Sequence, residues 1–330
     1  MTAASPLLRL PGAVAGDGVD APVAAHYGSF NGEQRTLTAG DGFVDLSHRG
    51  VVRVSGPDRL AWLHSLTTQH FESLEPGRPT VALVLSPQGH VEHAMYCVDD
   101  GEAFTAHVEP GAAPPLVDFL DRMRFMMRVE VTDLTDELAV AWRPVNDGTY
   151  DVLPRGELED YAQAAGPACG TWAFEALRIA RGEPRFGVDT DHRTIPNEVG
   201  WIVPAGPEEP KNEASRRVSW GAVHLDKGCY RGQETVARVH NLGRPPRRLT
   251  LLHLDGSENR LPAAGAEVTS AGRAVGVVGS SARHFELGPI ALALVKRNVA
   301  LDATLEVDGL VAAQEVVVDP EVGLHVRPLR

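Results

Sequence analysis

The residues best suited to chemistry lie in one short segment, residues 227–234, which reads Lys-Gly-Cys-Tyr-Arg-Gly-Gln-Glu. The thiol of Cys229 lies between two cations, Lys227 and Arg231, and just ahead of a stretch typical of a helix. Nearby Lys or Arg side chains and the positive end of a helix dipole both stabilise a thiolate, the form of cysteine that attacks electrophiles and binds metals. The segment therefore predicts a reactive Cys229.

Two glycines flank this thiol. Gly228 and Gly232 permit unusual backbone dihedrals and close approach of a ligand to the backbone, so a tight loop could expose the sulfur. Burial is the competing interpretation, because free cysteine is among the most buried residue types and both glycines could serve an ordinary turn. The residue types alone leave both interpretations open.

The elements next to the segment are predicted from periodicity and turn residues. A helix over 232–240 should follow it, with Gly243 marking its end and Pro245-Pro246 forbidding its continuation. Upstream, the stretch 183–220 is rich in Pro, Gly and charged residues, and it predicts a long ordered loop. Loops of that length in compact proteins are more often functional than incidental.

Strand and helix patterns predict the elements on either side. Before the loop we expect a strand over 51–54, helices over 57–66, 116–127 and 172–181, and a meander of strands over 80–85, 90–98 and 103–108. After Pro246 we expect only strands, over 249–254, 267–270, 274–280, 290–295, 304–307 and 313–318. Short strands at such spacing suggest a small barrel or sandwich. The Met and Phe stripe of the 116–127 helix is interpreted as core.

Composition restricts the class of protein and its partners. The chain has 330 residues, 43% apolar and 23% charged, which is ordinary for a globular protein of two or three packed units. Its net charge of −13 disfavours nucleic acid and anionic membranes as partners, although residues 178–248 carry a local charge of +4 that could attract an anionic ligand. The start of the chain does not read as a secretory signal. We therefore expect a cytoplasmic protein, and a monomer.

Cysteine and histidine spacing gives no sign of a structural metal or disulfide framework. The three cysteines, Cys97, Cys169 and Cys229, are widely spaced and form no Cys-x-x-Cys pair, which fits a reducing cytosol. We expect the first two to be structural. The histidines at positions 70, 90 and 93 have no spacing diagnostic of metal ligands, so no metal site is predicted.

The segment 227–234 matches the signature Lys-Gly-Cys-Tyr-x-Gly-Gln-Glu completely, and by it the chain resembles the YgfZ family and its mitochondrial iron–sulfur maturation relatives. The match continues through residues 235–240 and into 247–249. Other segments are similar to the wider superfamily shared with glycine-cleavage aminomethyltransferases: Tyr27-Gly28, Asp45-Leu46-Ser47-His48, Glu175-Ala176-Leu177-Arg178-Ile179, Ile195-Pro196-x-Glu198, 265–268 and 275–280. The resemblance covers nearly the whole chain from about Ala25 onward.

The resemblance implies an α+β fold, with a GcvT-like folate-binding body and a C-terminal β-barrel. On this basis we expect an N-terminal tail over 1–24, a body over 25–245 and a barrel over 246–330. The body would consist of two interlocked subdomains around a central opening, one over about 45–145 and the other over 25–44 with 146–245.

The resemblance also implies tetrahydrofolate as the ligand, with its pterin in the central opening and its glutamate tail toward basic residues. Arg178, Arg181, Arg185 and Arg238 are candidates for the tail by local charge. The remaining cofactor-binding candidates are Glu198, Gly228, Gly232, Gln233 and Glu234. Lys227 and Tyr230 are grouped with Cys229 as the reactive set.

Two departures from the transferase pattern separate this chain from an aminomethyltransferase. His93 stands where an Asp would assist one-carbon transfer, and Glu92 should point to the opposite face of a strand. Ala180 stands where transferases carry a Glu that pairs with the pterin. Both departures argue against an aminomethyltransferase and leave open whether the chain is an enzyme.

Three functions remain open. The first is a tetrahydrofolate-binding accessory protein for iron–sulfur cluster assembly or repair, with the assembly machinery or client proteins as partners. Because a typical cluster takes about four thiolates, Cys229 alone would engage a cluster only transiently. The second is a folate-dependent one-carbon transferase or demethylase. The third is a folate-storage module, in which changing Cys229 would have no effect.

Overall fold

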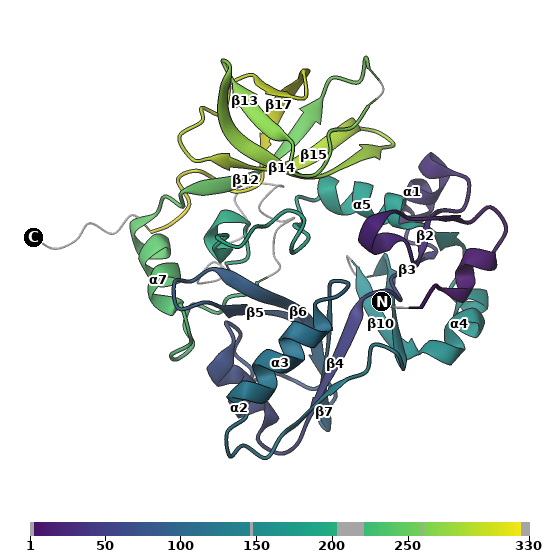
Figure 1. Cartoon of the computed structure of the whole chain (residues 1–330), viewed down its shortest axis with the longest axis vertical. Coiled ribbons are helices and arrows are strands. Elements are labelled where there is room, and N and C mark those ends of the chain that lie inside the picture. Colours follow the sequence, from purple (N-terminus) through teal and green to yellow (C-terminus); the bar gives the residue numbers. More distant parts are fainter. Residues whose placement is uncertain (1–2, 146–147, 203–220, 259, 325–330) are drawn as a thin grey trace, which may run out of the picture. The chain divides into compact units, whose positions relative to one another are not determined.

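The computed structural model describes residues 3–145, 148–202, 221–258 and 260–324 (Figure 1). The chain divides into two compact units, each assembled from segments that are distant in sequence. The first comprises Met1–Arg59, Glu75–Pro79 and Met95–Leu177, and the second comprises Leu60–Leu74, Thr80–Ala94 and Arg178–Arg330. The predicted boundary at residue 245 therefore falls inside the second unit.

One sheet of the first unit has the strand order β10-β9-β3-β11. Its strands are β3 (Phe43–Asp45), β9 (Leu138–Arg143), β10 (Thr149–Pro154) and β11 (Ala168–Cys169). Strand β9 pairs antiparallel with β10 and β3, whereas β11 pairs parallel with β3. The helices of this unit include α1 (Phe30–Thr38), α4 (Leu158–Ala164) and the start of α5 (Thr171–Ala180). Val44, Trp142 and Phe174 lie in the buried core that joins sheet and helices.

The other strands of this unit belong to the predicted meander and its neighbours. Strand β4 (Gly50–Ser55) pairs antiparallel with β7 (Ala103–Val108) on one side and β8 (Glu130–Asp133) on the other. Strand β6 (Val91–Asp99) continues from the second unit into the first, where it pairs with β7. The meander and the strand expected at 51–54 are confirmed.

Helix α3 (Ala113–Met123) packs against β4 and β8 and corrects one prediction. Leu116, Phe119 and Leu120 are buried, as expected for an amphipathic helix. The helix ends at Met123, however, and Met123 is exposed, while Met127, the other methionine of the stripe, lies beyond the helix and is half-buried. The interpretation of the stripe as core is therefore wrong for Met123, and the helix does not extend to Met127.

The N-terminal segment is an ordered part of the first unit in its described residues. Its elements are η1 (Pro6–Arg9), β1 (Val14–Ala15), η2 (Gly18–Asp20) and β2 (Ala24–His26). Leu7 is buried in one apolar cluster with Phe43 and Leu158, and Ser5 donates a hydrogen bond to the carboxylate of Asp45. Residues 3–24 therefore contribute to the core of this unit and do not form the separate tail that we expected.

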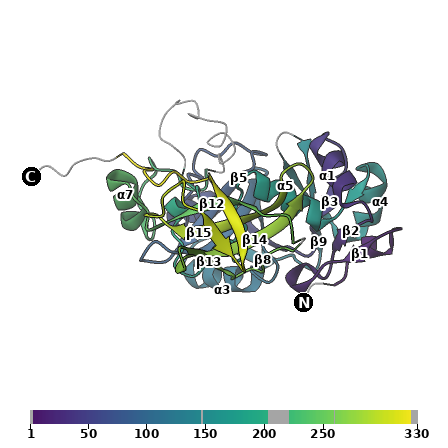
Figure 2. The same ribbon diagram turned by 90° about the horizontal axis from the view of Figure 1, so that it is seen from above.

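The second unit ends in a closed six-stranded barrel with the order β12-β15-β14-β13-β16-β17 (Figures 1 and 2). Its strands are β12 (Arg247–Leu254), β13 (Glu267–Ser270), β14 (Arg273–His284), β15 (Gly288–Lys296), β16 (Leu305–Val307) and β17 (Leu310–Val316). Leu252, Val278, Ala293 and Val307 are among the side chains that fill its interior. All six predicted strands are confirmed. Of the two architectures predicted for them, a barrel or a sandwich, the structure shows the barrel.

The rest of the second unit positions the loop 227–234. Its elements are α2 (Arg59–Leu66), β5 (Thr80–Leu85), the start of β6, η5 (Pro196–Glu198) and α7 (Gln233–Leu242). Of the predicted loop 183–220, residues 203–220 lie outside the described residues. None of the helices in the described ranges combines the length and the apolar character needed to span a bilayer.

Candidate functional site

The loop 227–234 begins at Lys227, whose side chain is buried although its ammonium is charged. The ammonium donates hydrogen bonds to the backbone carbonyls of His64 and Thr67, at the C-terminal end of α2. A lysine at this place satisfies carbonyls that the helix itself leaves without partners. Burial lowers the pKa of Lys227 to about 8. Lys227 thus anchors the start of the loop to α2.

The end of the loop is held at the start of α7. Gly232 caps that helix in the left-handed region, with φ of 80°, and a Cβ there would lie 2.4 Å from the carbonyl oxygen of Ser86. Ser86 opens the tight turn between β5 and β6, so the loop packs against this turn where only glycine fits. At Gly228 no atom lies within 4 Å of the place that a Cβ would occupy, and φ is outside the left-handed region. Of the two glycines, only Gly232 is required by the backbone.

Contacts within the loop, and one contact to β6, hold it further. Gln233 accepts a hydrogen bond from the backbone N–H of Tyr230 at 3.0 Å, and its own N–H donates to the carbonyl of Tyr230. Burial raises the pKa of Tyr230 to about 12, and the Lys227 ammonium lies 5.1 Å from the centre of its ring. Arg231 pairs with Glu92 on β6 at 3.1 Å.

Cys229 lies exposed on this loop, whereas Cys97 and Cys169 are buried. Burial raises the pKa of the Cys97 thiol, and it raises the pKa of the Cys169 thiol to about 12. The interpretation of Cys229 as buried filler is therefore wrong. The charges next to Cys229 already have other partners, because Lys227 donates to backbone carbonyls and Arg231 to the carboxylate of Glu92. Stabilisation of a Cys229 thiolate by these two cations therefore stays a prediction.

The arginines predicted for a folate tail differ sharply in their surroundings. The guanidinium of Arg178 is 2% exposed and donates to Asp189 and to the carbonyl of Glu183. Arg181 pairs with the carboxylate of Glu183 at 2.9 Å, and Arg185 is buried. Arg238, the fourth of these arginines, lies exposed on α7, as does Glu234.

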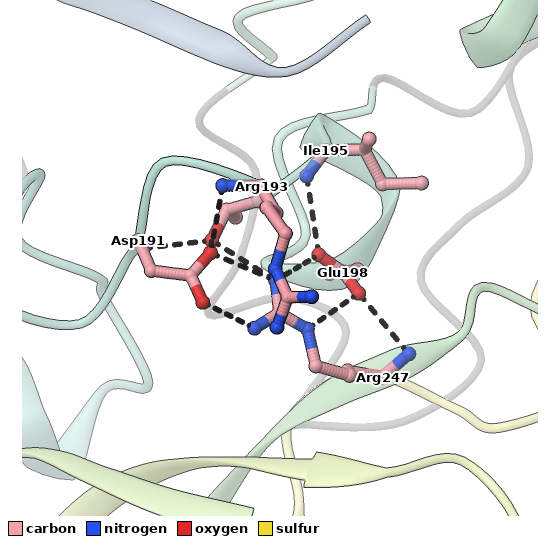
Figure 3. Close-up of polar contacts among 6 residues, drawn as sticks. Asp191, Arg193, Ile195, Glu198 and Arg247 are labelled. Atoms are coloured by element: carbon pink, nitrogen blue, oxygen red, sulfur yellow. Dashed lines mark hydrogen bonds and ion pairs between the residues drawn. The ribbon is translucent and has the colours of Figure 1, made fainter. Parts of the chain in front are cut away.

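Glu198 lies in a compact ionic network at the base of the barrel (Figure 3). Its carboxylate is bidentate to the guanidinium of Arg247, with both N–O distances 2.9 Å, and it accepts from the backbone N–H of Ile195. The same guanidinium binds Asp191 at 2.6 and 3.0 Å. This carboxylate is therefore already engaged by Arg247, which the sequence analysis did not single out as its partner.

A histidine group close to Lys227 was also missed. His64, whose carbonyl accepts from Lys227, lies beside His70 with ring centroids 4.7 Å apart, and His224 lies 5.2 Å from His70. His90 and His93 are not part of this group. Burial lowers the pKa of His93 to about 4, so its imidazole is neutral and supplies no negative charge.

Two protein-family models match separate parts of this chain. Residues 9–141 match the family model described as the GCVT N-terminal domain. Residues 247–321 match the model described as the CAF17 C-terminal beta-barrel domain. The GcvT-like fold of the chain, with its closed C-terminal barrel, confirms the predicted α+β fold class.

The proteins to which this chain is similar include a putative transferase and an iron–sulfur cluster assembly factor. A chloroplastic putative transferase of Arabidopsis thaliana is 26% identical over 318 residues, which cover 79% of this chain and 68% of that protein. A mitochondrial iron–sulfur cluster assembly factor IBA57 homolog of Mycosarcoma maydis is 25% identical over 224 residues. That match covers 63% of this chain and 56% of the fungal protein, so the chain spans just over half of the latter.

A solved structure shows the same fold at low identity. The crystal structure of the glycine cleavage system aminomethyltransferase T from Bartonella henselae matches with a TM-score of 0.74 and 18% identity. The match covers 96% of this chain and 97% of that one. At this identity the likeness establishes the fold only, and the activity has to be argued from the residues of the site.

Proposed function

We propose that this chain is a tetrahydrofolate-binding accessory protein for iron–sulfur cluster assembly or repair, of the YgfZ type, and that it acts through Cys229. One observation carries the proposal: the loop 227–234 is held at both ends and exposes this thiol, while the other two cysteines are buried. The name of the Mycosarcoma maydis relative supports the iron–sulfur role. The cytoplasmic location and the monomeric state stay predictions.

Cys229 would act as a transient ligand. A stable cluster takes about four protein ligands, and the buried Cys97 and Cys169 have raised pKa values that disfavour the metal-binding thiolate. One exposed thiol on a fixed loop suits brief coordination of a cluster that passes between the assembly machinery and a client protein. Anchoring by Lys227 and Gly232 would keep that thiol in one place.

Folate binding is supported by the GCVT N-terminal domain and by the fold. Of the proposed tail-binding residues, Arg238 is exposed and is the best candidate, whereas Arg181 is partly exposed but paired with Glu183. Arg178 and Glu198 are engaged in ion pairs, and we assign them to positioning the surrounding backbone. Gly228 and Glu234 are exposed at the loop surface, where a ligand could approach.

Replacement of Cys229 by Ser tests the iron–sulfur role directly. We expect cells that depend on the Cys229→Ser protein to lose activity of cluster-dependent enzymes, with the variant itself as stable as wild type because the side chain is exposed. Asp226→Asn, an exposed change three residues away, is the matched control and should retain wild-type activity. Full activity of cluster enzymes with Cys229→Ser would reject the proposed role.

A one-carbon transferase is the second candidate, favoured by the name of the Arabidopsis relative and by the fold of the Bartonella enzyme. The neutral His93 and the pairing of Glu92 with Arg231 argue against a catalytic carboxylate at this strand. Purified protein incubated with tetrahydrofolate and an aminomethyl donor decides between the two. Turnover that survives in Cys229→Ser would establish the transferase instead.

A further inference from the structure

Two histidines and a glutamate that have no role in the proposed function lie together in the second unit. His64 is in the last turn of α2, and His70 and Glu72 follow in the segment between α2 and β5. One side-chain ligand atom from each residue lies within 4.8 Å of the others. The two imidazole rings meet edge to face, at an interplanar angle of 85°.

One nitrogen of this group and one of a neighbouring histidine lack hydrogen-bond partners among the described residues. Nδ1 of His64 is buried without a partner, and so is Nδ1 of the neighbouring His224. Nδ1 of His70 lies 3.0 Å from the hydroxyl of Ser73, a contact that orients the ring and leaves Nε2 for another ligand. Buried polar atoms normally have a partner, and coordination of a metal ion would provide one.

The residue types of the group also suit metal binding, because imidazole nitrogens and a carboxylate are common ligands of divalent transition metals. Glu72 is exposed, so its carboxylate can move toward the imidazoles.

We infer that His64, His70 and Glu72 bind one divalent transition-metal ion, of the zinc or ferrous class. Two imidazoles and one carboxylate form the ligand set of catalytic zinc sites and of non-haem ferrous sites alike. Ligand atoms around tetrahedral zinc lie roughly 3.3 Å apart, so modest side-chain rotations bring the three atoms to coordinating distance. His224 lies next to this group, with its ring centroid 5.2 Å from that of His70, but it is not one of the three residues whose ligand atoms come together.

The site would connect α2 to the loop that carries Cys229. Lys227 donates to the carbonyl of His64, so a metal that fixes the end of α2 also fixes the anchor of the loop. Cys229 itself is not part of the ligand group. Metal binding at this group does not depend on the proposed function of Cys229.

Metal titration of the chelator-treated full chain tests the inference. Cys229 is first alkylated, so that it cannot bind metal, and Zn²⁺, anaerobic Fe²⁺ and Mg²⁺ are titrated separately by calorimetry. We expect one Zn²⁺ or Fe²⁺ per chain, no binding of Mg²⁺, and a visible d–d spectrum of tetrahedral type when Co²⁺ is bound. The comparison of Zn²⁺ with Fe²⁺ shows which ion is preferred.

Variants locate the bound ion. His70→Ala and Glu72→Gln should weaken Zn²⁺ binding at least tenfold, and Glu72 is exposed, so its variant retains the fold whatever happens at the histidines. His192→Ala and Glu75→Gln, both exposed and outside the group, are the matched controls and should bind as wild type does. Absence of stoichiometric Zn²⁺ and Fe²⁺ binding, or equal affinity in Glu72→Gln and Glu75→Gln, would overturn the inference.

Discussion

Arg178 and Asp189 form an ion pair that is closed to solvent, with side chains 2% and 0% exposed and an N–O distance of 2.8 Å. The carboxylate of Asp189 also accepts hydrogen bonds from the backbone N–H of Arg185 and from both the N–H and the hydroxyl of Ser280. Ser280 is on β14, so this single carboxylate joins the end of α5 and the following loop to the barrel within the second unit.

Asp189→Asn should destabilise the protein strongly. The amide keeps the shape but leaves the buried Arg178 guanidinium without its counter-ion, and breaking a buried pair in this way costs about 3–5 kcal/mol. The free energy of unfolding in urea measures the loss. Asp302→Asn, an exposed change in the same unit, is the control and should stay within about 0.5 kcal/mol of wild type. Equal stability of the two variants would contradict a structural role for the pair.

This pair also shows what the sequence could not reveal. The positive charge of residues 178–248 suggested an anionic ligand for Arg178, but local charge counts do not tell which cations have partners inside the protein. Asp189, only one loop further along, takes up that charge, and Asp191 with Glu198 does the same for Arg247. Exposure, which the sequence does not give, separates Arg238 from the buried arginines.

The fold was predictable where its pairing is local. The barrel strands and the first meander follow one another along the chain with clear turn residues, so alternation and turns were enough to predict them. In the sheet of β3, β9, β10 and β11, the hairpin of β9 and β10 is local and was nevertheless not predicted. The short strands β3 and β11 of this sheet were missed because they pair with strands far away in sequence. His64, His70 and His224 were missed as a group for the same reason, since only the folded chain brings His224 beside the other two.

The stability of the protein at low pH should depend on Asp191. Hydrogen bonds from Arg247 hold the pKa of this carboxyl well below its usual range. The unfolded chain binds this proton near pH 4, whereas the folded chain does not, so the contribution of the pair is present above about pH 4 and is lost as the pH falls below it.

Unfolding free energies between about pH 5 and pH 2.5 check this dependence. We expect Asp191→Asn to lose less stability than wild type over that range, because the amide has no proton to bind. Asp302→Asn, whose carboxyl is exposed, should follow the wild-type curve. Identical slopes for wild type and Asp191→Asn would show that the contact with Arg247 contributes nothing in solution.

Replacement by alanine should destabilise the protein at Gly232 and have little effect at Gly228. At Gly232 an alanine must adopt φ of 80°, and its Cβ would lie 2.4 Å from the carbonyl of Ser86, so the turn between β5 and β6 has to move. Strain of this kind costs about 1–3 kcal/mol, and the displaced loop should also change the rate at which iodoacetamide alkylates Cys229. At Gly228 no atom lies within 4 Å of the added methyl group, so Gly228→Ala should unfold within about 1 kcal/mol of wild type. Urea unfolding and the alkylation rate of Cys229, measured side by side in the two variants, test whether contact with the turn holds the thiol in place. If Gly232→Ala matches Gly228→Ala in both measurements, the loop is not fixed by that contact.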